Sequence, residues 1–295
     1  MKNQTKAYIL AIFAVFFWST VATAFKIALK ELSVLQLLCV ATYTTFFISG
    51  TYILITGKTK MLVAIKTKEI LLFAVLGILN PIAYYLVLFK AYDLLPAQIA
   101  QPLNYTWPVV LVFLSAPLLK QSLRWNSFVA LGISFAGVLV ISYSGGRLSS
   151  GNIDITGVIL AAGSSVIWAL YWLLNARNGQ DAVVKIFFNF MFGSVYITLL
   201  MLFFGGFDTL TLKGVLPAVY VGFFEMGLTF ILWMSAMQLT DRNDKISPLV
   251  YLSPFISLIF IHFILGEKIY DSTFIGLFLI IAGIMFVRVF KVKSS

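Results

Sequence analysis

Charged residues are scarce in this chain of 295 residues: only 11% are Asp, Glu, Lys or Arg, whereas 61% are hydrophobic. Soluble domains are about one quarter charged and about half apolar. The sequence therefore has too few polar residues to cover the surface of a water-soluble domain of this length. We expect the lipid bilayer to surround most of the chain.

Cysteine and histidine each occur once, as Cys39 and His262. A single cysteine excludes a disulfide framework and a cysteine-based metal site. His262 stands alone, so a packed or hydrogen-bonded histidine explains it better than a proton relay. The sequence has no H-E-x-x-H, Gly-x-Ser-x-Gly or Walker A motif, and no filter motif or charged ring typical of channels. We therefore predict that the protein is not an enzyme and that it has no cofactor and no metal site.

Acidic residues are few as well: 11 Asp and Glu against 21 Lys and Arg give a net charge of +10. The basic residues stand in short clusters between apolar stretches, which is typical of membrane topology and not of a nucleic-acid partner. With the N-terminus inside, fifteen Lys and Arg fall on the inner side and six on the outer side, as the positive-inside rule requires. We expect a multi-pass protein of the bacterial inner (cell) membrane, with both termini cytoplasmic.

Long apolar stretches make up most of the sequence. A helix needs about 20 apolar residues to cross the roughly 30 Å core of a bilayer. Lipid offers no partner for unpaired backbone groups, so these segments must be helices. The first of them, 7–29, lacks a convincing signal-peptide cleavage site and is expected to stay as a span. The ten predicted spans are 7–29, 33–56, 70–93, 96–119, 126–144, 155–176, 182–205, 213–239, 246–266 and 272–290.

The sequence also contains a duplication, because 101–137 aligns with 247–283 at a constant offset of 146. A shared Pro-x2-Tyr-x2-Pro inside an apolar run is hard to obtain by chance. Each copy holds five spans, an odd number, so the second copy enters the membrane from the opposite side. The sequence thus predicts an all-α membrane protein with ten transmembrane helices, arranged as two inverted five-helix repeats around a central cavity. The matched pairs include Pro102 with Pro248, Tyr105 with Tyr251, and Pro108 with Pro254.

The repeats set the expected domains: a first five-helix repeat over 7–144, a Gly- and Ser-rich linker over 145–154, and a second repeat over 155–290. Glycines on the fifth and tenth spans would let helices approach closely. They indicate packing within a monomer or, alternatively, a homodimer contact. These glycines are Gly132, Gly137, Gly276 and Gly283.

The fourth predicted span carries a polar stripe at helical spacing. Polar side chains are costly in lipid unless they face a bundle interior or water. We interpret the stripe as the wall of a substrate cavity; the alternative is hydrogen bonding between helices around a kink. Prolines in the fourth and ninth spans remove backbone donors, and we expect them to act as kinks and gates. The stripe residues are Gln98, Gln101, Asn104 and Tyr105, and the prolines are Pro102, Pro108, Pro248 and Pro254.

Glu225 is the only carboxylate well inside a predicted span, and it is equivalent to Asn80 in the other repeat. Asn80 and Tyr84 are expected on one face of the third span. A carboxyl group in lipid favours its neutral form unless it is paired, so Glu225 is a candidate for proton coupling or for binding a substrate ammonium group. The alternative is a protonated side chain that bonds a neighbouring helix.

Aromatic side chains with polar atoms recur in the sixth span, and they suit an amphipathic ligand. Trp168 is equivalent to Trp18 in the first repeat, and Tyr171 or Trp172 follows on the same stripe. Tryptophan and tyrosine also gather at membrane interfaces, so the alternative is an interfacial position. Trp107 lies on the other side of its helix from Tyr105.

Four motifs are characteristic: Asn104-Tyr-Thr-Trp-Pro108, Ile167-Trp-Ala-Leu-Tyr171, Tyr251-Leu-Ser-Pro254 and Gly266-Glu267. With these motifs the chain resembles the EamA family of the drug/metabolite transporter superfamily. The first three are similar to stretches of an aromatic amino acid exporter of that family. The resemblance implies a ten-helix basket in which Tyr105, Trp107, Trp168 and Tyr171 lie at or near a large cavity; Glu225 departs from the exporter.

These observations favour a secondary active transporter that exports neutral amino acids, including aromatic ones, or related small metabolites by alternating access. Its partners would be a small-molecule substrate, the bilayer and possible coupling protons. One alternative is a proton-coupled exporter of cationic drugs, in which Glu225 neutralises the charge. Another is a membrane interaction or sensory protein that transports nothing. The expected cavity residues are Trp18, Asn80, Tyr84, Gln98, Gln101, Asn104, Tyr105, Trp107, Trp168, Tyr171, Trp172, Glu225 and Tyr251.

Overall fold

The protein is described by a computed structural model, in which every regular element among the described residues is a helix. Six of these helices are long and apolar enough to cross a membrane, and shorter apolar helices accompany them. The chain is therefore a multi-pass membrane protein, as its composition predicts. The described residues are 2–119, 125–148, 153–176, 178–206, 210–240 and 246–292.

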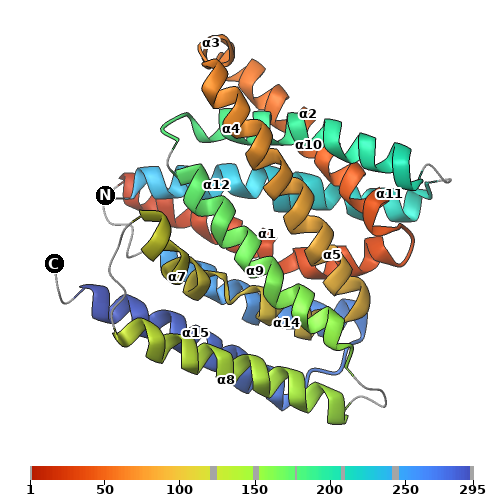
Figure 1. Cartoon of the computed structure of the whole chain (residues 1–295), viewed down its shortest axis with the longest axis vertical. Coiled ribbons are helices and arrows are strands. Elements are labelled where there is room, and N and C mark those ends of the chain that lie inside the picture. Colours follow the sequence, from red (N-terminus) through yellow and green to blue (C-terminus); the bar gives the residue numbers. More distant parts are fainter. Residues whose placement is uncertain are drawn as a thin grey trace. The chain divides into compact units, whose positions relative to one another are not determined.

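One compact unit is formed by Met1–Leu86 and Asn178–Phe260. In this unit α1 packs against α11 and α12, and α2 packs against α10 (Figure 1). The short helix α3 lies in a stretch where no helix was predicted. The elements are α1 (Lys2–Leu29), α2 (Val34–Ile55), α3 (Thr59–Val63), α4 (Thr67–Gly77), η1 (Ile78–Ala83), α10 (Ala182–Phe204), α11 (Leu212–Tyr220), η2 (Val221–Leu228), α12 (Thr229–Leu239) and η3 (Ser247–Leu252).

The second unit comprises Val87–Arg177 and Ile261–Ser295. Here α8 and α15 lie side by side (Figure 1), and α9 packs against α6 and α7. Two helices cross from one unit to the other: α5 (Tyr84–Leu94) and α14 (Ser253–Leu265). The remaining elements are α6 (Ala97–Asn104), α7 (Trp107–Leu119), α8 (Trp125–Leu148), α9 (Ile155–Ala176) and α15 (Asp271–Val292).

The units do not coincide with the predicted repeats, since each unit takes helices from both halves of the chain. The division into repeats at 7–144 and 155–290 stays a prediction. Of the predicted linker, residues 149–152 lie outside the described residues, and α8 extends to Leu148.

Two predicted helices depart from regular α-helical geometry near their middles. Over 70–93 the helix passes through η1, a π-helical turn, which we call a wide turn because it holds more residues than a turn of α-helix. Within η1, Asn80 has the extended angles φ −144° and ψ 115°. Pro81 explains this conformation, because a proline disfavours helical angles in the residue before it and supplies no backbone donor. Over 213–239 the wide turn η2 stands at the equivalent place, without a proline inside it. Wide turns of this kind are frequent at functional sites.

The fourth predicted span is divided into α6 and α7, with a turn at Tyr105 and Thr106 between them. In a continuous helix the carbonyl of Asn104 would accept a hydrogen bond from the N–H four residues later. That residue is Pro108, which has no N–H. The helix therefore ends at Asn104 and starts again at Trp107.

Candidate functional site

The two wide turns of the first unit bury polar side chains in an otherwise apolar surrounding. Asn80, in η1, is 2% exposed, and Glu225, in η2, is 8% exposed. The Tyr85 hydroxyl donates a hydrogen bond of 3.2 Å to Glu225 Oε1. Tyr84, which was the predicted neighbour of Asn80, is buried with its ring 4.6 Å from that of Tyr85.

Both wide turns lie against the same stretch of α2. Thr45 Oγ1 donates a hydrogen bond of 2.8 Å to the Gly222 carbonyl in η2. On the other side, Gly193 of α10 leaves room for η1: a Cβ atom there would lie 2.5 Å from Pro81 Cγ and 3.5 Å from Thr42 Cγ2. Thr42 and Thr45 are one helical turn apart, so α2 bridges the two turns.

Several buried oxygen atoms around these turns have no hydrogen-bond partner among the described residues. A buried polar atom without a partner costs free energy, and each case calls for a ligand, a water molecule or a functional reason. These atoms are Glu225 Oε2, Asn80 Oδ1, Thr42 Oγ1 and Thr229 Oγ1.

The other predicted site residues of this unit lie either among aromatic side chains or near the start of a helix. Trp18 is half-buried, and its ring packs 5.8 Å from Phe230 and 5.4 Å from Trp233. Tyr251 is half-buried in η3, and Pro254 is buried in the first turn of α14. Pro248 lies at the start of η3, but its side chain lies outside the described part of the chain.

In the second unit, the break between α6 and α7 is tied to α9. Asn104 Nδ2 donates a hydrogen bond of 2.8 Å to Ser164 Oγ, and Thr106 Oγ1 donates one of 3.1 Å to Ser165 Oγ. The structure therefore shows hydrogen bonding between helices at this part of the polar stripe. Tyr105, Trp107 and Pro108 are half-buried, whereas Gln101 and Pro102 are buried; Gln101 Oε1 has no partner among the described residues.

Gln98 is buried and uses its amide to fix the segment before α15. Its Oε1 atom accepts hydrogen bonds from the Tyr270 N–H and the Thr273 hydroxyl, both 3.1 Å long. Its Nε2 atom donates to the Lys268 carbonyl at 2.8 Å. These bonds give Gln98 a structural role, and its place at a substrate cavity stays a prediction.

Glu267 is a structural residue that the sequence-based argument singled out only as part of a family motif. Its carboxylate accepts hydrogen bonds from the backbone N–H groups of Ala97 at 2.9 Å and Gln98 at 3.2 Å. The first N–H groups of a helix have no partner within the helix, so Glu267 caps α6. His262 Nδ1 lies 3.0 Å from the Glu267 carbonyl oxygen, which agrees with the hydrogen-bonded histidine that we expected.

The aromatic stripe of α9 forms one cluster. The Trp168 ring lies 5.7 Å from Tyr171, in a stacked arrangement, and 6.0 Å from Trp172, edge to face. Trp168 and Tyr171 are buried, and Trp172 is half-buried. The structure thus brings these three predicted residues together on a single helix.

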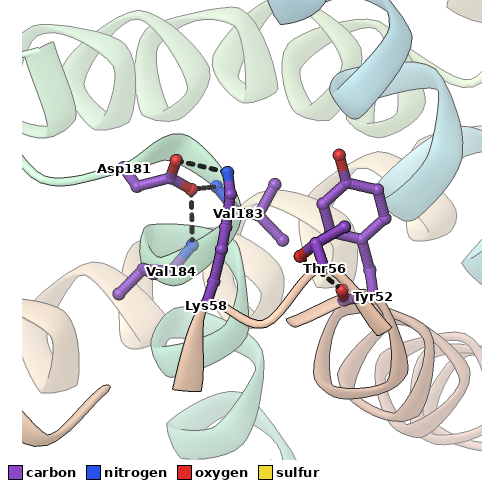
Figure 2. Close-up of polar contacts among 6 residues, drawn as sticks. All are labelled: Tyr52, Thr56, Lys58, Asp181, Val183 and Val184. Atoms are coloured by element: carbon purple, nitrogen blue, oxygen red, sulfur yellow. Dashed lines mark hydrogen bonds and ion pairs between the residues drawn. The ribbon is translucent and has the colours of Figure 1, made fainter. Parts of the chain in front are cut away.

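A charged contact joins the segment between α2 and α3 to the start of α10 (Figure 2). Lys58 Nζ lies 2.7 Å from Asp181 Oδ2, while Asp181 Oδ1 accepts hydrogen bonds from the N–H groups of Val183 and Val184. Burial opposes ionisation of Asp181, but the hydrogen bonds from Lys58, Val183 and Val184 outweigh it and hold the pKa of this carboxyl below its usual range. Asp181 is therefore an ionised cap of α10.

Comparison with known proteins adds the following relatives. The uncharacterized transporter YvbV of Bacillus subtilis (strain 168) is 25% identical over 221 residues, which are 74% of this chain and 71% of that protein. An uncharacterized transporter of Clostridium kluyveri is 25% identical over 172 residues, 56% of this chain and 55% of its own length. One in the sor 3' region of Acidianus ambivalens is 26% identical over 173 residues, 57% of this chain and 66% of its own length.

The fold is shared with a protein of known crystal structure, at a TM-score of 0.70 with 19% identity over 99% of both chains. The EamA-like transporter family matches two stretches of this chain, residues 5–143 and 155–289. Together these stretches include nearly all of the sequence. The chain therefore belongs to the EamA-like transporter family.

Proposed function

We propose that this protein is a secondary active transporter that exports neutral amino acids, aromatic ones included, or related small metabolites by alternating access. The observation that carries the proposal is Glu225, a buried carboxyl group in the wide turn η2 with one oxygen atom that has no partner among the described residues. Charged groups at membrane depth are costly, and they mark substrate or ion pathways. Wide turns inside helices are frequent at functional sites.

We further propose that the chain has ten transmembrane helices in two inverted repeats. The contact between α8 and α15 supports this arrangement, because it is reciprocal at the offset of 146. A Cβ atom at Gly137 would lie 2.5 Å from the Gly276 carbonyl oxygen, and one at Gly283 would lie 2.7 Å from that of Ala130. Ala130 corresponds to Gly276 and Gly137 to Gly283, since both pairs are 146 residues apart. A two-fold axis across two antiparallel helices produces this exchange of partners.

A second reciprocal contact in the other unit supports the same symmetry. A Cβ atom at Gly77 would lie 2.8 Å from the Asn189 carbonyl oxygen, and one at Gly222 would meet the carbonyl oxygen of Ala41. Gly77 and Gly222 are 145 residues apart, and Ala41 and Asn189 are 148 apart. The third predicted span (70–93) therefore crosses the seventh (182–205) in the way that the eighth (213–239) crosses the second (33–56).

The predicted cavity residues remain part of this proposal. In the second unit, the aromatic cluster of α9 supports recognition of an apolar or aromatic group. In the first unit, the buried carboxyl of Glu225 supports recognition of a polar group. The break at Pro108, and the change from η3 to α14 beside Pro254, support a gating role for the fourth and ninth predicted spans, because helices bend where the regular hydrogen-bond pattern is lost. We place the protein in the inner membrane with both termini cytoplasmic, on the charge distribution given above.

A second candidate function is proton-coupled export of cationic, amphipathic compounds. Glu225 favours it, because a lone buried carboxylate would neutralise a positive charge on the substrate and exchange it for a proton. A third candidate, a membrane interaction or sensory protein, predicts no flux at all.

A flux assay in liposomes tests the proposal. The purified chain is given labelled phenylalanine, labelled leucine and a cationic dye, with and without an imposed proton gradient. We expect saturable uptake of the amino acids, and we expect Glu225→Gln to abolish any dependence of that uptake on pH. Uptake of the dye alone would favour the second candidate, and no flux of any solute would favour the third. Unchanged pH dependence in the variant would exclude proton coupling at Glu225.

A further inference from the structure

Four buried oxygen atoms of η1, η2 and their neighbours have no partner among the described residues: Glu225 Oε2, Asn80 Oδ1, Thr42 Oγ1 and Thr229 Oγ1. Asn80 Oδ1 can only accept hydrogen bonds, as can Glu225 Oε2 when the carboxyl group is ionised, whereas the hydroxyls of Thr42 and Thr229 can donate as well as accept. None of these groups carries a positive charge, so they cannot compensate the charge of an ionised Glu225.

These side chains are held in place by contacts within one unit. The Tyr85 hydroxyl fixes Glu225 through Oε1, which leaves Oε2 as the available oxygen. Thr229 follows directly after η2 and is fully buried. All of these side chains are more than nine-tenths buried, since their exposure ranges from 0 to 8%.

The chemistry of the missing partner follows from the uncompensated charge. The Tyr85 hydroxyl bonds Glu225 Oε1 and supplies no charge, so an ionised Glu225 would leave its charge and its Oε2 atom without a partner among the described residues. A protonated primary amine supplies three donors, no acceptor and one positive charge that compensates the carboxylate. An ammonium group therefore matches both the charge of Glu225 and its available oxygen atom.

We propose that Glu225, oriented by the hydrogen bond from Tyr85, binds the protonated amine of the transported solute. This inference rests on the proposed function and gives its substrate class: solutes that carry a primary ammonium group, with or without a carboxylate. Glu225 is the residue that touches the amine, and Tyr85 is a positioning residue.

Binding to the purified full-length chain in lipid nanodiscs tests the inference without requiring transport. Three probes that share a phenyl group are titrated by calorimetry: phenylalanine, 2-phenylethylamine, which lacks the carboxylate, and 3-phenylpropionate, which lacks the amine. We expect the wild-type chain to bind both amines and to bind 3-phenylpropionate at least about tenfold more weakly, because a hydrogen bond to a charged group is lost.

The variants separate this role from a structural one. Glu225→Gln keeps the size of the side chain and should weaken both amines by about tenfold or more, while Glu225→Asp should retain part of the binding. Tyr85→Phe should weaken the binding of both amines less than Glu225→Gln does. Asp93→Asn is the matched control, since Asp93 is an exposed carboxylate paired with Lys90, and it should leave binding unchanged. Thermal melting of each variant verifies that it is folded.

Four outcomes would overturn the inference. The first is equal affinity of the folded Glu225→Gln variant and the wild-type chain for the amines. The second is that the wild-type chain binds 3-phenylpropionate as tightly as phenylalanine. The third is that it binds none of the three probes. The fourth is amine binding that disappears when choline replaces sodium, which would assign the oxygen atoms to a metal cation. Amine binding without flux in liposomes would leave the site standing and refute the transport proposal alone.

Discussion

At the scale of single residues, Asp181 combines two separable contacts. Its carboxylate caps α10 through Val183 and Val184, and it pairs with Lys58 at 2.7 Å. Asparagine also caps helices but carries no charge, so Asp181→Asn removes the ion pair and keeps the cap. Asp181→Ala removes both contacts.

We expect Asp181→Ala to lower the free energy of unfolding by about 1–2 kcal/mol and Asp181→Asn by at most about 1 kcal/mol. Thermal melting in detergent measures both, and Lys58→Met, which removes the same ion pair from its other side, should match Asp181→Asn. Equal losses for the two Asp181 variants would show that the cap contributes nothing. Because the pKa of Asp181 is lowered in the folded chain, its contribution is present at neutral pH and is lost as the pH falls through that lowered pKa.

Residue patterns predicted the buried carboxyl group but not its partner. Glu225 stood out because it was the only acid well inside an apolar span. Helical spacing placed Tyr84 on the face of Asn80, whereas the structure uses the next residue, Tyr85, to bond Glu225. The wide turn η1 changes the direction in which the following residues point, and a period of 3.6 residues does not include such a turn.

At the scale of helices, the close crossing of α8 and α15 depends on particular glycines. Gly137 lies against the backbone of Gly276, so a Cβ atom there would overlap with a carbonyl oxygen, whereas nothing lies within 4 Å of the Cβ position of Gly132 on the same helix. Backbone cannot move aside as a flexible side chain can. The two positions therefore form a matched pair for testing the crossing.

We expect Gly137→Ala to destabilise the protein by about 1–3 kcal/mol, the usual cost of overpacking. Gly132→Ala should leave the melting temperature unchanged or raise it, because alanine favours helix by about 1 kcal/mol over glycine. Melting curves of the two purified variants measure the difference. A loss of stability in Gly132→Ala as large as that in Gly137→Ala would refute the close crossing.

Helix positions followed well from the length of apolar runs, but their interruptions followed only where a proline was present. Pro108 was a predicted kink, and the helix breaks beside it because proline has no N–H. Pro81 was not among the predicted kinks, although the same missing N–H and its effect on the preceding residue disturb the helix there. The wide turn η2 contains no proline, and its residues are as apolar as those of a regular helix. The structural role of Gln98 could not be predicted either, because its partners Tyr270 and Thr273 lie in a distant part of the sequence.

At the scale of the whole molecule, the predicted duplication relates pairs of helix contacts that are far apart in the sequence. The reciprocal contacts of Gly137 and Gly283, and of Gly77 and Gly222, support the proposed repeats, because the contacting residues are separated by nearly the offset of the duplication. The third and eighth predicted spans differ at one pair of equivalent positions, because η1 holds Asn80 and η2 holds Glu225. A transporter needs both properties: symmetry allows two alternative states of access, and asymmetry selects the solute.

The central claim is that this chain moves an amine-bearing solute across the membrane, and counterflow tests it most directly. Liposomes containing the protein are loaded with unlabelled phenylalanine and diluted into a trace of labelled phenylalanine. The account predicts transient accumulation of label above its equilibrium level with the wild-type chain, and much less with Glu225→Gln. Wild-type liposomes that take up label no faster than protein-free liposomes would contradict it.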